Sequence, residues 1–214
     1  EALARRFHLL GASVVVSDVV EAGITNLAAE LNAKRPNSVL AVTADVSTEN
    51  GNKQLVATAR QFLSQNGSNG IDLFFANAGV GNGTLIETTS ESDWNLAFNV
   101  NVHAHRWAAK YLIEEWLKTG RGYFCSTASA AGLLSQIGSM PYSMTKSAAV
   151  AFAESLAEET LPSSSPVENQ VAAELDDEAI TELLEADESE LYTELDDILS
   201  EVAEIRAQSQ QSVN

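Results

Sequence analysis

The chain has little that could cross-link it or hold it in a membrane. Its 214 residues include one cysteine, Cys125, so an internal disulfide bond is excluded. Cys125 lies in the apolar run 122–126, where a buried structural thiol is expected rather than a reactive one. The sequence contains no run of about 18 apolar residues, so no membrane-spanning helix is predicted. The three histidines and the cysteine lack the spacing of metal ligands, and no metal site is predicted.

Basic residues are also scarce. The chain has 12 Lys and Arg residues against 30 Asp and Glu residues, which gives a net charge of −18. The imbalance lies mainly near the C-terminus, because 15 of the acids but only one base, Arg206, follow Val167. Residues 1–167 hold the other 15 acids and 11 bases and are only mildly acidic. A field of this sign disfavours nucleic acids and anionic membranes as partners.

The apolar pattern predicts strands alternating with helices. Short runs rich in β-branched and aromatic residues predict strands over 13–17, 38–42, 71–75 and 122–126. Helical periodicity, together with glycine stops and a capping box at Ser90, predicts helices over 1–10, 24–34, 52–65, 90–118 and 139–159. This alternation is typical of an α/β fold, a doubly wound parallel sheet with right-handed crossovers.

Polar residues follow the ends of the predicted strands. Asp18, Asp45, Asn77 and Ser129 each come after an apolar run. Ligands of open parallel sheets bind outside the carboxyl ends of the strands. We therefore expect these four side chains to converge on one edge of the sheet and form a site there.

The most informative motif is Tyr142 with Lys146, preceded by Ser129. Residues four apart on a helix share one face, so the ammonium group can lie beside the phenol and favour the phenolate. A phenol tuned in this way can exchange a proton with a carbonyl or an alcohol near neutral pH. A serine hydroxyl at the same oxygen can stabilise the charge that develops there.

Three further motifs accompany Tyr142 and Lys146 in order along the chain: Thr43-Ala-Asp45-Val46, Asn77-Ala-Gly79, and Asn101 within a helical stretch. With these motifs, residues 1–158 resemble the short-chain dehydrogenase/reductase (SDR) family. The resemblance implies a Rossmann-like sheet. It also implies an NAD(P)-dependent enzyme that transfers hydride between a secondary alcohol and a ketone.

The resemblance implies a role for each matching catalytic position. Tyr142 would be the general acid and base, Lys146 would tune it and hold the nicotinamide ribose, and Ser129 would orient the reacting oxygen. Asn101 would place a water molecule in a proton relay behind Lys146. The sequence around these positions leaves alternatives open. Ser126 or Thr127 could take the role of Ser129, and Asn99 could take the role of Asn101.

The resemblance also implies the contacts of the cofactor. Asp45 and Val46 would contact adenine, and the backbone of Asn77, Ala78 and Gly79 would approach the dinucleotide closely. Asp18 would bind the adenosine ribose hydroxyls. A carboxylate there repels a 2′-phosphate, so NAD is expected rather than NADP.

Both ends of the chain depart from the family pattern. No strand and glycine-rich turn precede Glu1, so we expect an N-terminal truncation and weak dinucleotide binding by the chain as given. The expected domains are a partial Rossmann domain over 1–160, a linker over 161–168 and an acidic amphipathic helical tail over 169–214. The expected partner is a small alcohol or ketone of unspecified identity. A homo-oligomer and a cytoplasmic location are further expectations.

A second hypothesis follows from the same departures. The chain could keep the sheet but lack a grip on the cofactor, and act as a catalytically inactive interaction module through its acidic tail. A glycine-rich turn ahead of Glu1 in the source gene would favour the enzyme.

Overall fold

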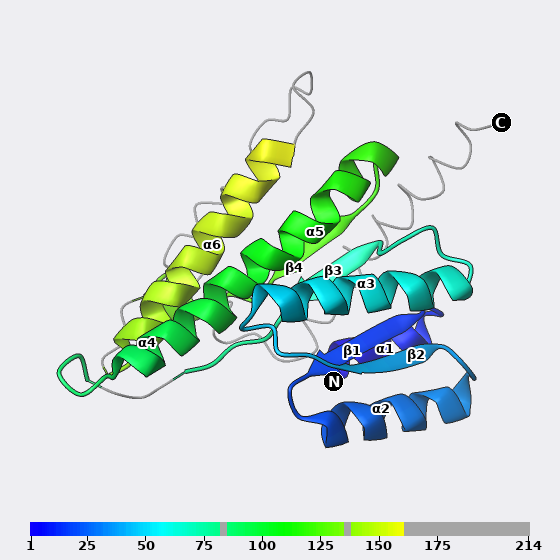
Figure 1. The fold of residues 1–214 in the computed structure, drawn as a ribbon, viewed down its shortest axis with the longest axis horizontal. Helices are drawn as coiled ribbons and strands as arrows, with labels where there is room; N and C mark the ends of the chain where they lie inside the picture. The colour runs from blue at the N-terminus through cyan, green and yellow to red at the C-terminus, as the bar shows by residue number, and fades with distance from the viewer. Residues whose placement is uncertain (82–84, 135–137, 161–214) are drawn as a thin grey trace, which may run out of the picture. The chain divides into compact units, whose positions relative to one another are not determined.

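The structure, a computed structural model, describes residues 1–81, 85–134 and 138–160 (Figure 1). All of them belong to the first of two compact units in the chain, Glu1–Ser165. The expected linker over 161–168 and helical tail over 169–214 lie outside the described residues. Within the described part, strands and helices alternate as the sequence predicts.

The elements follow one another in a regular order. They are α1 (Ala2–Leu9), β1 (Val14–Asp18), α2 (Glu21–Lys34), β2 (Val39–Thr43), α3 (Glu49–Gln65), β3 (Leu73–Ala76), α4 (Glu91–Phe98), the π-helical turn η1 (Asn99–His103), α5 (Ala104–Thr119), β4 (Tyr123–Ser126), the 3₁₀ turn η2 (Ala130–Gly132) and α6 (Met140–Thr160). No helix of the described part is long and apolar enough to cross a membrane.

Helix starts are set by caps as well as by apolar spacing. The Ser90 hydroxyl accepts a hydrogen bond from the Asp93 backbone N–H, as the predicted capping box requires. Helix α3 begins at Glu49, three residues before the predicted start, because the Thr48 hydroxyl accepts from the Gly51 N–H. Helix α2 also begins three residues early, with the acid Glu21 in its first turn. Apolar periodicity alone misses these polar first turns.

The four described strands form two parallel pairs. Strand β1 pairs with β2 from Val14↔Val39 to Asp18↔Thr43, and β3 pairs with β4 from Leu73↔Tyr123 to Ala76↔Ser126. Among the described residues, no strand ladder joins β1 to β3. The predicted parallel arrangement of the strands is confirmed. The two pairs are joined by helices that pack against strands of both.

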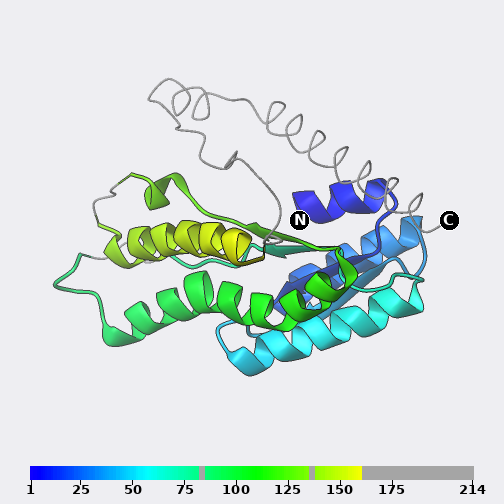
Figure 2. The same ribbon diagram turned by 90° about the horizontal axis from the view of Figure 1, so that it is seen from above.

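Helices α1 and α3 cover opposite faces of the strands and connect the two pairs (Figure 2). On the α3 side, Val15 of β1 and Phe74 of β3 both pack against one buried cluster, whose members are Val56, Ala59, Ile71, Ala108, Leu112 and Trp116. On the α1 side, Ala4 belongs to the cluster beneath β1 and β2, and the Phe7 ring lies 5.5 Å from the Phe75 ring. These contacts join the two strand pairs through the helices on their faces.

Truncating Leu112 should destabilise the fold strongly. Its side chain is 0% exposed within the α3–α5 cluster. Leu112→Ala should lower the free energy of unfolding by about 2–5 kcal/mol, because the cavity left behind cannot fully collapse. Leu117→Ala, on the same helix at 59% exposure, is the matched control and should cost far less. Urea unfolding of the three proteins measures the difference, and equal costs would contradict the placement of Leu112.

Candidate functional site

Two of the predicted acids lie exposed beside the carboxyl ends of β1 and β2. Asp18 is the last residue of β1, and Asp45 follows β2 by two residues. Each carboxylate shapes its own turn: Asp18 Oδ1 accepts from the Val20 N–H at 2.8 Å, and Asp45 Oδ1 accepts from the Ser47 N–H at 2.9 Å. These local bonds fix the direction of both acids at the strand ends.

Tyr142 and Lys146 meet on α6, as their spacing predicts. Lys146 Nζ lies 5.7 Å from the centroid of the Tyr142 ring. Lys146 is 3% exposed, although lysine is rarely buried without an acidic partner. Its ammonium group donates a hydrogen bond of 2.7 Å to the carbonyl oxygen of Thr127, directly after β4. This hydrogen bond connects α6 to the carboxyl end of β4 at the buried ammonium group.

The glycine-rich loop after β3 runs close against Lys146 and Tyr142. A Cβ atom on Gly79 would lie 3.4 Å from Lys146 Nζ and 3.5 Å from Asn101 Oδ1. A Cβ atom on Gly81 would lie 3.3 Å from the Tyr142 ring. Backbone can therefore approach the site here where larger side chains would crowd it. Asn77, Ala78 and Gly79 are exposed, which fits a surface for an extended ligand.

Asn101 ties this loop to α6. Its Oδ1 accepts from the Val80 N–H at 2.8 Å, and its Nδ2 donates to the Val80 carbonyl at 2.8 Å and to the Thr145 hydroxyl at 2.9 Å. The side chain is 0% exposed. It lies in the π turn η1, within what the sequence predicted as one continuous helix; such turns are frequent at functional sites. The role of holding a water molecule stays a prediction.

Ser129 lies on the segment that packs along α6. Its hydroxyl accepts from the Ala131 N–H at 3.2 Å and so caps the turn η2. The end of that turn is pressed against α6: a Cβ on Gly132 would lie 2.9 Å from the Lys146 backbone, and the Ser147 hydroxyl donates to the Gly132 carbonyl at 2.7 Å. Close packing of η2 on α6 thus brings the Ser129 segment to the helix that carries Tyr142.

Two threonines, Thr127 and Thr145, make hydrogen bonds within the site that the sequence analysis did not predict. Besides binding Lys146, Thr127 donates its hydroxyl to Asn77 Oδ1 at 3.1 Å, which links the ends of β3 and β4. Thr145 is buried and donates to the Tyr142 carbonyl at 2.9 Å. Pro141, Thr145 and Ala149 form a buried stripe at helical spacing, and that stripe is the signal that could have revealed Thr145.

His105 on α5 and Cys125 in β4 are both neutral at physiological pH. Burial, aided by the charge of Lys146, lowers the pKa of His105 to about 4. Burial raises the pKa of the Cys125 thiol to about 11, which agrees with the structural role expected for it.

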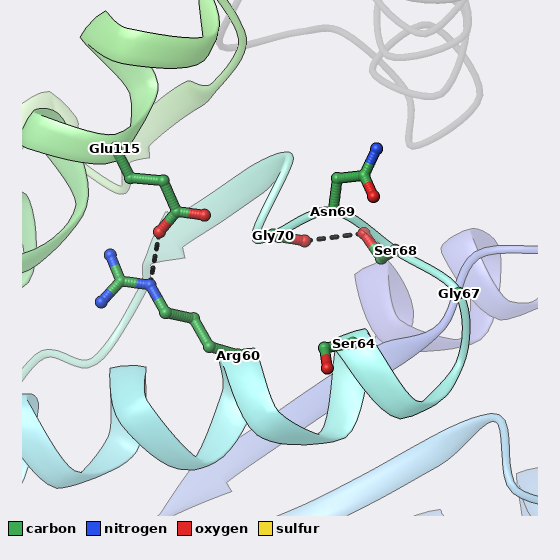
Figure 3. Close-up of a pocket in the computed structure, with 7 residues that line it drawn as sticks. All are labelled: Arg60, Ser64, Gly67, Ser68, Asn69, Gly70 and Glu115. Atoms are coloured by element: carbon green, nitrogen blue, oxygen red, sulfur yellow. Dashed lines mark hydrogen bonds and ion pairs between the residues drawn. The ribbon is translucent and has the colours of Figure 1, made fainter.

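A separate hollow of about 470 Å³ opens at the other end of the strands (Figure 3). Its floor holds an ion pair between Arg60 and Glu115, and the Ser68 hydroxyl donates to the Gly70 carbonyl at 2.7 Å. The hollow is lined by the loop that precedes β3, so it lies at the amino end of that strand. It is therefore distinct from the site at the carboxyl ends.

Comparison with known proteins agrees with this geometry. Residues 1–181 match the short chain dehydrogenase family, and the chain belongs to that family. It is 31% identical over 157 residues to meso-2,3-butanediol dehydrogenase of Serratia marcescens, covering 73% of this chain and 59% of that protein. It is 32% identical over 161 residues to the peroxisomal hydratase-dehydrogenase-epimerase of Neurospora crassa, covering 72% of this chain and 17% of that protein.

Solved structures give the same result. A short chain dehydrogenase/reductase from Burkholderia phymatum, crystallised in complex with NAD, superposes with a TM-score of 0.69 at 30% identity. The match covers 74% of this chain and 54% of the other. The chain thus spans less than two thirds of the length of these relatives.

Proposed function

We propose that this chain forms the catalytic part of an NAD-dependent oxidoreductase that transfers hydride between a secondary alcohol and a ketone. The observation that carries the proposal is the pair Tyr142 and Lys146 on α6, with the lysine buried against the carboxyl end of β4. Burying an ammonium group against a neutral carbonyl, without a carboxylate partner, is unfavourable for folding, and such an arrangement is typical of functional sites.

Each side chain would have a distinct role. Tyr142 would donate a proton to the ketone oxygen in reduction and remove it from the alcohol in oxidation. The ammonium group of Lys146, 5.7 Å from the centroid of the Tyr142 ring, would stabilise the negative charge that develops on the phenol oxygen as the proton is transferred. The Ser129 hydroxyl would donate a hydrogen bond to the same substrate oxygen as negative charge develops on it. Asn101 would keep the Gly79–Gly81 loop against α6 through its bonds to Val80 and Thr145.

The residues at the strand ends fit a dinucleotide. Asp18 would bind the adenosine ribose, Asp45 and Val46 would contact adenine, and the exposed backbone of 77–79 would lie along the cofactor. The bound nicotinamide would supply or accept the hydride. The related protein from Burkholderia phymatum in complex with NAD supports this assignment. The Asp18 carboxylate would repel the 2′-phosphate of NADP, which favours NAD.

Dinucleotide binding tests the proposal. We define the extended protein as this chain preceded at Glu1 by a β-strand and a glycine-rich turn, which together supply a phosphate site at a helix N-terminus. The extended protein should bind NAD more tightly than NADP, and Asp18→Ala should narrow that difference by removing the repulsion. Asp72→Ala, an exposed acid outside the strand-end site, is the control and should leave the preference unchanged. Isothermal titration of the three proteins with both dinucleotides measures the six affinities.

The same titration distinguishes the alternatives. Tighter binding of NADP by the extended protein would overturn the role given to Asp18. Failure of a folded extended protein to bind either dinucleotide would favour the non-catalytic interaction module instead.

A further inference from the structure

His105 joins three elements immediately behind the site. It lies on α5 at 1% exposure, with its ring centroid 6.4 Å from that of Phe124 in β4 and 6.4 Å from that of Phe152 in α6. The two phenylalanine rings are 6.1 Å apart, so the three rings form an edge-to-face cluster.

The hydrogen bonds of His105 indicate which nitrogen carries the proton. Nδ1 lies 3.0 Å from the Ser126 hydroxyl oxygen, while Nε2 is buried and has no hydrogen-bond partner among the described residues. A proton on Nε2 would leave a buried donor unpaired, which is costly. A proton on Nδ1 is donated to Ser126 instead and leaves a lone pair on Nε2 within the aromatic cluster. The Nδ1–H form is therefore favoured.

Ser126 is one residue away from the group that holds Lys146. It ends β4, and the next residue, Thr127, accepts from Lys146 Nζ and donates to Asn77. The peptide between the two residues is planar, and the Thr127 N–H donates to the Ala76 carbonyl at 3.1 Å, so only the φ and ψ of Thr127 separate a fixed Ser126 from the Thr127 carbonyl. A fixed Ser126 therefore narrows the directions that this carbonyl can take.

The imidazole is suited to this place only while it is neutral. Lys146 on α6 is the charged group that lowers its pKa, and Cys125 in β4 adds no charge because burial keeps its thiol protonated. A protonated ring would set a second cation close to the buried ammonium group.

We propose that His105 is a positioning residue: its neutral ring fixes Ser126 at the end of β4, and Ser126 in turn presents the Thr127 carbonyl to Lys146. The importance of that lysine for turnover rests on the proposed function. The contact between Lys146 and the Thr127 carbonyl does not rest on the proposed function. It can be measured in the chain as it exists, without any assay of activity.

The test measures how well the fold protects the Lys146 amine from chemical acetylation. The chain is treated with acetic anhydride, and acetylation of Lys146 relative to the exposed Lys34 is followed by peptide mass spectrometry. His105→Phe keeps the ring but removes the hydrogen bond, and it should raise the relative rate about tenfold, the effect of losing roughly one hydrogen bond. Ser126→Ala should have the same effect, and the double variant should add little. His105→Asn, which retains a donor near the position of Nδ1, should restore part of the protection.

A matched control separates positioning from general loosening. Phe152→Leu disturbs the same aromatic cluster but leaves the bond between His105 and Ser126 in place, so it should lower the melting temperature without exposing Lys146. Unchanged protection in His105→Phe and Ser126→Ala would overturn the proposal. The wild-type chain provides a second check that needs no variant: nitrogen-15 NMR of labelled histidine should show the proton of His105 on Nδ1. A proton on Nε2 would also overturn the proposal.

Discussion

Tyr142→Phe in the extended protein should reduce turnover by about 10²–10⁴-fold or more, the usual contribution of a positioned acid and base. The substitution removes the proton donor and keeps the ring that packs against the Gly81 backbone, where a Cβ would already lie 3.3 Å away. Dinucleotide affinity should therefore change little. Steady-state kinetics with a panel of secondary alcohols and ketones, together with NAD titration, measures both quantities.

Tyr111→Phe is the matched control for this substitution. Tyr111 lies on α5 and donates its hydroxyl at 2.9 Å to Glu49, the first residue of α3, rather than to a residue assigned to catalysis. Removing the Tyr111 hydroxyl should leave turnover near the wild-type rate. A Tyr142→Phe protein as active as Tyr111→Phe would exclude the proposed mechanism, whatever the fold.

Much of this site can be predicted from the sequence, because several of its features depend only on residues close together in the chain. The spacing of Tyr142 and Lys146 places them on one face of a helix, and runs rich in β-branched or aromatic residues predict the strands that precede Asp18 and Asn77. The family resemblance implies that the 77–79 backbone approaches the dinucleotide closely, and the structure places Gly79 beside the Lys146 ammonium group and Gly81 beside the Tyr142 ring.

The contacts that organise the site are not local, and spacing does not reveal them. Asn101 meets Val80 from 21 residues away and Thr145 from 44 residues away, and Lys146 reaches the Thr127 carbonyl across 19 residues. Such pairs depend on how the helices pack against the strand ends. The π turn at Asn99–His103 is equally hidden, because its residues fit the pattern of a continuous helix.

Lys146→Met should separate function from stability. The lysine is 3% exposed and its ammonium group bonds to a neutral carbonyl, so an apolar side chain of similar length removes an unfavourable buried charge. Leaving the Thr127 carbonyl without its donor opposes this gain by about 1–3 kcal/mol. We therefore expect the free energy of unfolding, measured by urea, to stay within roughly 2 kcal/mol of wild type.

Function should respond very differently to the same change. In the extended protein, Lys146→Met should lower both turnover and NAD affinity, because one ammonium group is assigned to tune Tyr142 and to hold the nicotinamide ribose. Lys146→Arg should not rescue either property, since Lys146 is 3% exposed and the larger, planar guanidinium group differs in shape from the ammonium group buried there. Lys118→Met, an exposed lysine paired with Glu114 on α5, is the control and should leave turnover and affinity unchanged. A folded Lys146→Met protein that keeps wild-type affinity for NAD would refute the ribose contact. One that keeps wild-type turnover would refute the electrostatic role, because no other Lys or Arg is buried in the described part of the chain.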